Sequence, residues 1–283
     1  MSDIERLLRG SIDIHIHPGP DVISRTVDVI EAARQAQQAG MRAIVLKNHY
    51  YTTAPLATLA GKLVPGIEVF GGLCLNSEIG GLNTFALKTS VTLGAKIVWM
   101  PTFSAVGSER KPAGGGISIL DKDGKLLPGV ASILELVKQN DLVLATGHIP
   151  PVEAIALIEE AARKGISKLA ITHPLPLINF RAFNRPFELD DLRKLTQIGA
   201  FIDVTFLSLM KAELKNSIGS VLEPIRAIGI DHIIMSTDLG QVDKPLPVEG
   251  MRMCISKLLQ NGFSDEEIEL MIKVNPAKLL GLK

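Results

Sequence analysis

The chain has 283 residues, and its 30 lysine and arginine residues balance its 30 aspartate and glutamate residues, so the formal net charge is zero. This balance argues against a protein that binds nucleic acid or an anionic membrane, because both partners attract a positive surface. Hydrophobic residues make up 46% of the chain and charged residues 21%, a composition that favours a large core over a disordered chain.

Three further features predict a cytoplasmic protein. Cys74 and Cys254 are the only cysteines, which is too few for a disulfide framework, and they have no CxxC spacing, so a reducing compartment fits. The first residues lack the apolar run of a signal peptide. No uninterrupted apolar run reaches the roughly 18 residues of a membrane span.

Short apolar and β-branched runs alternate with helical patterns along the chain. Eight runs predict strands, at residues 11–17, 42–49, 67–75, 95–100, 141–148, 168–173, 200–206 and 232–238. Between them, stretches such as 27–40, 131–140, 152–165 and 220–229 repeat apolar residues every three or four positions, as helices with one buried face do.

The spacing of the strands predicts the fold class. From Ile12 to His232 the chain advances 220 residues over seven repeats, and roughly 31 residues is the size of a βα unit. We therefore expect one α/β domain over residues 1–283, a (β/α)8 TIM-like barrel with C-terminal helices. A doubly wound open sheet is the alternative, but no G-x-G-x-x-G turn follows the first strand.

One connection, between the fourth and fifth strands, is longer than the others and contains residues 101–129. A glycine run at 114–116 and the Asp123-Gly124 dipeptide predict a flexible loop that leads into a small hairpin. Long loops at the carboxyl face of a barrel often cover a substrate site. We expect this role here, with a plain surface loop as the alternative.

Five of the six histidines fall at the ends of predicted strands. They are His15 and His17 on the first strand, His49 on the second, His148 on the fifth and His173 on the sixth. Active sites of barrel enzymes gather at that end of the strands. His232 opens the eighth strand instead, so it should lie at the opposite end and is expected to be structural.

Alternation along the first strand predicts which side chains enter the barrel. The inward set is Asp13, His15 and His17, and the outward set is Ile12, Ile14 and Ile16. Two imidazoles on one face can bind one divalent ion, and Asp238 at the end of the eighth strand is placed to join them. Imidazole ligands favour zinc, so we expect one or two divalent ions, with zinc as the expected metal.

These residues resemble the pattern of the amidohydrolase superfamily, metal-dependent hydrolases built on a (β/α)8 barrel. That pattern has H-x-H ending strand one, a histidine ending strands five and six, and an aspartate ending strand eight. Its counterparts here are His15, His17, His148, His173 and Asp238. Residues 263–282 also resemble the C-terminal helices of such proteins. The resemblance implies hydrolysis of an amide, lactone or ester bond in a small molecule by a metal-activated water.

Two departures from that pattern leave alternatives open. Many binuclear members have a carboxylated lysine or a glutamate at the end of strand four, where this chain reads Trp-Met-Pro-Thr over 99–102. Glu78 and Lys47 are candidates for such a bridging ligand, or else Glu78 is a solvated loop acid and Lys47 a buried cation paired with Asp13 or Asp203. His49 is the second departure, because the superfamily pattern does not require a histidine there. It is either an added ligand or a substrate contact.

The resemblance also implies catalytic roles. Asp238 would accept a proton from water and pass it to the leaving group. His148 and His173 would be ligands if two ions bind, and with one ion one of them would act as an electrophile toward the substrate. Lys47 is a further catalytic candidate.

For substrate binding the candidates are Trp99, Arg181 and Arg185, with Arg110 and Lys111 in the long loop also able to receive a carboxylate or phosphate. Trp99 is alternatively ordinary packing, and the loop cations are alternatively solvated.

Three other functions stay open. A histidine-rich phosphoesterase family also opens with H-x-H, but its members tend to end with D-x-H, whereas Leu239 and Gly240 follow Asp238. A decarboxylase of the amidohydrolase superfamily and a metal-binding protein without catalysis are the others. We expect a small molecule as the partner, with neither nucleic acid nor membrane, and we leave homo-oligomerisation open.

Overall fold

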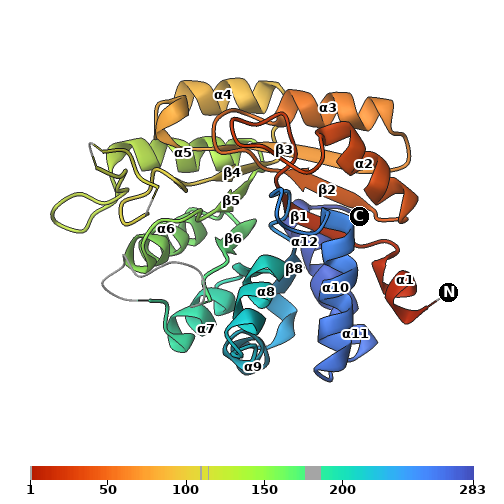
Figure 1. Ribbon diagram of the computed structural model, residues 1–283. Coiled ribbons are helices and arrows are strands. Elements are labelled where there is room, and N and C mark those ends of the chain that lie inside the picture. The colour runs from red at the N-terminus through yellow and green to blue at the C-terminus, as the bar shows by residue number, and fades with distance from the viewer. Residues whose placement is uncertain (1, 109, 114, 176–185) are drawn as a thin grey trace.

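The described part of the chain contains eight parallel strands, which form the centre of the protein, with helices around them (Figure 1). The computed structural model describes residues 2–108, 110–113, 115–175 and 186–283. The strands are β1 (Ile12–Ile16), β2 (Ala43–Leu46), β3 (Glu68–Cys74), β4 (Ile97–Trp99), β5 (Val143–Ala145), β6 (Leu169–Thr172), β7 (Phe201–Thr205) and β8 (Ile233–Ser236). Each pairs in parallel with the next along the chain, so the predicted (β/α)8 barrel is confirmed.

Helices follow the strands as the periodicity predicts. They are α1 (Asp3–Leu8), α2 (Val29–Gln38), α3 (Ala54–Leu63), α4 (Thr84–Thr92), α5 (Pro128–Gln139), α6 (Pro151–Arg163), α7 (Leu189–Gln197), α8 (Phe206–Leu214), α9 (Gly219–Ile228), α10 (Pro247–Gln260), α11 (Asp265–Glu269) and α12 (Asn275–Leu280). Capping sets their limits: the Asp28 carboxylate accepts hydrogen bonds from two backbone N–H groups at the start of α2, and Gly40, just beyond its end, has a φ of +73°. Among the described residues, no helix combines the length and the hydrophobicity that crossing a membrane requires.

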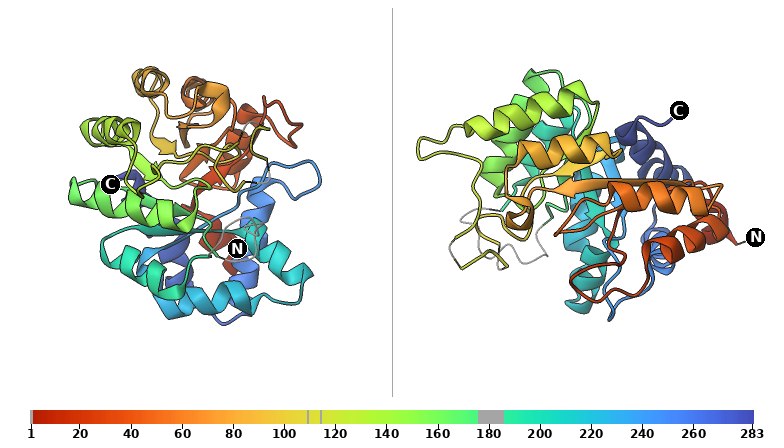
Figure 2. Two further views of the ribbon diagram at one scale, coloured as in Figure 1. Left: turned by 90° about the vertical axis from the view of Figure 1, so that its left-hand side faces the viewer. Right: turned by 90° about the horizontal axis from the view of Figure 1, so that it is seen from above.

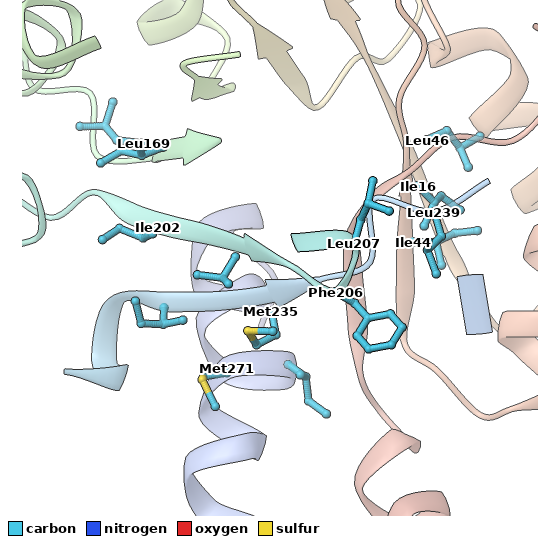
Figure 3. Packing of buried hydrophobic residues seen from close by; sticks show 14 of the residues in the cluster. Ile16, Ile44, Leu46, Leu169, Ile202, Phe206, Leu207, Met235, Leu239 and Met271 are labelled. Carbon is cyan, nitrogen blue, oxygen red and sulfur yellow. The ribbon is translucent and has the colours of Figure 1, made fainter. Parts of the chain in front are cut away.

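Two buried clusters lie on the two sides of the strands. The outer cluster joins strand side chains such as Ile44, Ile202 and Met235 to the helices, and Figure 3 shows Phe206 and Met271 packed near β7 and β8. The inner cluster draws on all eight strands, through Ile12, Ile14, Ala43, Val45, Cys74, Ile97, Trp99, Val143, Ala145, Ala170, Phe201 and Ile234. Leu279 and Leu280 of α12 belong to it as well, so the barrel interior is packed with side chains.

The predicted alternation along β1 is wrong for three residues. Ile12 and Ile14 belong to the inner cluster, and Asp13 pairs in register with Ile44, whose side chain belongs to the outer one. The register between β1 and β2 shifts between Asp13 and Ile16, as happens at a β-bulge. This irregularity lets His15 face the interior directly after the inward Ile14.

The barrel closes where β1 meets the end of β8. The backbone N–H of Asp238 donates to the His15 carbonyl at 2.8 Å, and that of His17 donates to the Leu239 carbonyl at 2.7 Å. The Asp13 carboxylate strengthens this seam by accepting hydrogen bonds from the N–H and the hydroxyl of Thr237. Barrel closure therefore brings residues 15, 17 and 238 to one place.

The long connection after β4 contains the predicted hairpin. Leu120 and Leu126 form an antiparallel bridge, and the N–H of Asp121 donates to the Lys125 carbonyl at 2.8 Å. The buried Glu153 carboxylate of α6 accepts hydrogen bonds from Ser118 and from the N–H of Ile119. The connection lies at the end of the barrel away from both termini (Figure 2), held there by α6.

Gly147 allows the chain to turn between β5 and His148. It has a φ of +59°, and a Cβ there would lie 2.2 Å from the Met100 carbonyl oxygen. We expect Gly147→Ala to lower the free energy of unfolding by roughly 2 kcal/mol or more, because the contact and the backbone strain act together. Urea unfolding measures this loss. Gly124→Ala is the control, since Gly124 also has a positive φ but open space around it; equal losses would refute the steric argument.

Candidate metal centre and active site

A cavity of about 290 Å3 opens at the carboxyl ends of the strands. Its described lining includes every predicted metal ligand, namely His15, His17, His49, His148, His173 and Asp238. Lys47, which follows β2, lines it too. The five strand-end histidines thus lie together, as their places in the sequence predicted. Their individual roles stay predictions.

His15, His17 and Asp238 form the tightest group. One ligand atom from each lies within 4.8 Å of the others. The Nε2 atoms of the two imidazoles are 3.3 Å apart, and the Asp238 carboxylate is 3.3 Å from His15 Nε2 and 3.1 Å from His17 Nε2. All three residues are buried. Two imidazole nitrogens and a carboxylate oxygen that converge in this way form a donor set that suits a divalent transition metal.

Asp203 orients the His15 ring. Its Oδ2 atom is 3.0 Å from His15 Nδ1, and its Oδ1 accepts a hydrogen bond from Ser236 at 2.5 Å. Burial raises the pKa of Asp203 to about 6. The ionised carboxylate can only accept a hydrogen bond, which favours the His15 tautomer with its proton on Nδ1. His15 Nε2 is then left with its lone pair toward His17 and Asp238, the arrangement that makes a histidine a strong ligand.

We expect Asp203→Asn to weaken metal binding about 10- to 100-fold, because the neutral amide orients and polarises His15 less well. Competition with a chromophoric chelator measures the affinity of the purified protein for zinc. A folded Asp203→Asn variant with the parent affinity would show that the His15–Asp203 hydrogen bond has no influence on the metal.

His148 and His173 form a second imidazole pair beside this group. Their Nε2 atoms are 3.1 Å apart, and the His173 ring lies 5.8 Å from the His15 ring. His173 has a φ of +30° and Asp238 a φ of +55°. Residues other than glycine rarely adopt such values, and strain of this kind is often found at functional sites.

His49 is held by residues that the sequence did not indicate. Its Nδ1 atom lies 2.8 Å from the Thr102 hydroxyl, and the Asn76 amide donates to both Thr102 and the His49 carbonyl. The His49 ring stacks on the rings of Phe103 and His17. The distances between ring centres are 3.6 Å to Phe103 and 4.9 Å to His17. The single observable signal was that Asn76 and Thr102 follow the ends of β3 and β4.

Lys47 lies deep in the cavity. Its Nζ atom is 3.2 Å from His15 Nε2 and 5.2 Å from the centre of the Trp99 ring. Within the described parts of the chain, no ion pair joins Lys47 to Asp13 or Asp203, so the expected pairing is not found. The contact with His15 places Lys47 beside the candidate ligands, which suits a catalytic cation or, once carboxylated, a bridging ligand.

Burial sets the protonation of the histidines. It lowers the pKa of His15 to about 3, with the Lys47 charge adding to the effect, and lowers those of His17 and His173 to about 4. Burial also lowers the pKa values of His49 and His148. Although burial opposes its ionisation, the pKa of Asp238 lies below its ordinary value because His15 and His17 face it. Neutral imidazoles beside an ionised carboxylate are the forms that bind a metal.

Other sequence predictions have different outcomes. Trp99 is only 2% exposed and belongs to the inner cluster, and it is not part of the described cavity lining; its substrate role stays a prediction. Glu78 is exposed, contacts Ser104 and is not part of the described cavity lining, so this structure does not place it among the candidate ligands. His232 lies before β8 against Phe201 at the start of β7, as predicted. Arg181 and Arg185 lie outside the described residues.

Solved structures share this barrel. A probable dipeptidase, PvdM, from Pseudomonas aeruginosa is 13% identical with a TM-score of 0.69, over 98% of this chain and 96% of that one. An amidohydrolase from the same organism is 14% identical, with a TM-score of 0.66 over 99% and 98%. An organophosphorus hydrolase from Deinococcus radiodurans is 12% identical, with a TM-score of 0.59 over 98% and 94%. The expected resemblance to amidohydrolases is thus confirmed for the fold.

The sequence itself matches one family model. No curated protein matches the sequence of this chain. The family model matches residues 10–203, a stretch that begins before β1 and contains the five strand-end histidines and Asp203 but stops short of Asp238. Since this match covers more than half of the chain, the protein belongs to DUF6282, a family of unknown function.

Proposed function

We propose that this protein is a metal-dependent hydrolase that cleaves an amide, lactone or ester bond of a small molecule. The observation that carries the proposal is the convergence of His15, His17 and Asp238 at one point of a cavity, at the end of the barrel where such enzymes have their active sites. The likeness of the fold to a dipeptidase, an amidohydrolase and an organophosphorus hydrolase supports it.

His15, His17 and Asp238 would hold the ion. Zinc is the proposed metal, because imidazole nitrogen suits zinc better than magnesium or calcium. A divalent ion bound there would lower the pKa of a water molecule and polarise the bond to be cleaved. The His148–His173 pair offers two more nitrogens at 3.1 Å from each other, which is where a second ion would find ligands.

Asp238 is the proposed proton-transfer group. Its carboxylate lines the cavity and lies 3.1 Å from His17 Nε2, where it can take a proton from water and return it to the leaving group. Its carboxylate has a second oxygen besides the one that faces His15 and His17, so accepting a proton is compatible with a contact to a metal.

His173 and Lys47 are the proposed electrostatic groups. His173 lines the cavity beside His148, where an imidazole N–H can donate to a substrate oxygen if one ion is bound. Lys47 lies 3.2 Å from His15 Nε2, and a cation so placed would stabilise negative charge that develops on the substrate.

The test combines metal analysis with turnover. Protein purified without chelators is analysed for its metals and then assayed with amides, lactones, carboxylate esters and phosphate esters. Hydrolysis that is lost on chelation and restored by zinc supports the proposal. Release of CO₂ would indicate the decarboxylase, selective turnover of phosphate esters the phosphoesterase, and bound metal without any turnover the binding protein.

We propose the cytoplasm as the place of action and a small molecule as the partner. Both cysteines are unpaired and buried, which suits a reducing compartment. The cavity volume of about 290 Å3 supports a small-molecule substrate.

A further inference from the structure

Positive side chains surround the cavity. In the described part of the lining, the cations are Arg25, Lys47, Arg110, Lys211 and Lys244, whereas Asp238 is the only carboxylate. A cavity lined by charges of one sign concentrates ligands of the other sign. A metal held by Asp238 would make the cavity more positive still.

Two of these cations already have acidic partners. Arg25 contacts the Asp21 carboxylate at 2.6 Å, and Lys244 contacts that of Asp243 at 2.6 Å. Lys47 lies at the bottom, beside His15. Arg110 and Lys211 differ from Arg25 and Lys244, because no ion pair within 4.0 Å involves either of them among the described residues.

The Arg110 guanidinium packs on an aromatic ring of the cavity lining. Its guanidinium lies 4.5 Å from the centre of the Phe103 ring, and that ring stacks on His49 at 3.6 Å. The guanidinium, the Phe103 ring and the His49 ring are therefore stacked in that order, with His49 among the clustered histidines. An arginine held by a ring face keeps its N–H groups available for a planar anion.

Lys211 lies on α8, about 100 residues after Arg110 in the chain. Burial lowers its pKa, and the nearby charges of Lys244, Lys215 and Arg110 lower it further, against the favourable effect of Asp238. The side chain is half-buried. An anion beside it would relieve both the desolvation and the repulsion.

We propose that Arg110 and Lys211 bind an anionic group of the substrate, a carboxylate or a phosphate, at the mouth of this cavity. The inference rests on the proposed function in taking the ligand to be the substrate. The rest of the molecule would lie against Ile23, Phe103 and Leu207, which are the larger apolar side chains of the described lining. A volume of about 290 Å3 suits a small organic acid or phosphate ester.

Calorimetry at low ionic strength tests the site with three probes of similar size: benzoate, phenyl phosphate and neutral benzamide. The proteins are the parent, Arg110→Ala/Lys211→Ala, the charge-conserving Lys211→Arg, and Lys111→Ala. Lys111, which the sequence also offered as an anion contact, is the matched control, because the structure leaves it exposed next to Arg110 and outside the described lining. Each is measured both as purified and after chelation.

We expect the parent to bind an anion at least tenfold more tightly than benzamide, and the double variant to lose about tenfold or more in anion affinity. Lys211→Arg and Lys111→Ala should stay within about twofold of the parent. Tighter binding of benzoate would identify a carboxylate substrate, and tighter binding of phenyl phosphate a phosphate ester.

Equal anion affinity of the parent and the double variant, or no preference over benzamide, would overturn the proposal. An equal loss in Lys111→Ala would do so as well, because it would reflect general charge rather than this pair. Anion binding that depends on Arg110 and Lys211 in a protein that holds no metal and hydrolyses nothing would refute the proposed function and leave the anion site standing.

Discussion

Replacing His15 and His17 together by alanine should remove the ion that these residues share with Asp238. The two Nε2 atoms supply two of the three ligand atoms that lie within 4.8 Å of one another, and Asp238 alone cannot hold a transition metal tightly at neutral pH. Elemental analysis of protein purified without chelators should give about one equivalent of metal or more for the parent and about one equivalent less for the variant. Turnover should fall with the metal.

His232→Gln provides the control for this experiment. His232 packs against Phe201 at the opposite end of the barrel, so its loss removes an imidazole without touching the cavity. This variant should keep its metal and its activity. A full metal load in the folded double variant would exclude His15 and His17 as ligands, and metal loss in His232→Gln would show that the metal binds elsewhere.

Asp238→Asn should lower turnover about 100-fold or more while much of the metal is retained. The amide keeps the size of the side chain and one oxygen for coordination, but it cannot accept a proton near neutral pH. His15 and His17 still face the same point. The measurements are kcat with the best substrate of the panel, metal content after purification, and the rate as a function of pH, whose acid limb should change.

Two other results would revise this role. If the folded variant loses its metal, Asp238 acts chiefly as a ligand, and added zinc should then restore part of the turnover. If it keeps its metal and nearly normal turnover, Asp238 does not transfer the proton and the proposed mechanism is wrong at this step.

The sequence predicted the barrel well because its signals are local and repeat. Each strand is a short apolar run, each helix shows its own periodicity, and the regular spacing of about 31 residues matches the βα unit. The strand-end positions of His15 and His148 indicated a shared site for the same reason, since all parallel strands of a barrel end on one face. No knowledge of tertiary contacts was needed.

Contacts between distant residues account for what was missed. The shift in register within β1 depends on its pairing with β2, so alternation alone placed Asp13 on the wrong face. Asp203 was considered only as a partner for Lys47, because the 188 residues between it and His15 hid their hydrogen bond. Lys211 had no motif around it, and only the packing of α8 beside the cavity brings it near Arg110.

The contact between β1 and the end of β8 means that a bound ion would also stabilise the closure of the barrel. His17 and Asp238 are 221 residues apart in the chain, yet backbone hydrogen bonds at 2.7 and 2.8 Å join their segments. An ion bound by residues on both segments would link the first and last strands of the barrel. At a hundredfold excess over its Kd it would add about 2.7 kcal/mol to the free energy of unfolding. Chelation should therefore loosen the first and last strands together, so that hydrogen exchange at His17 and Asp238 rises in step.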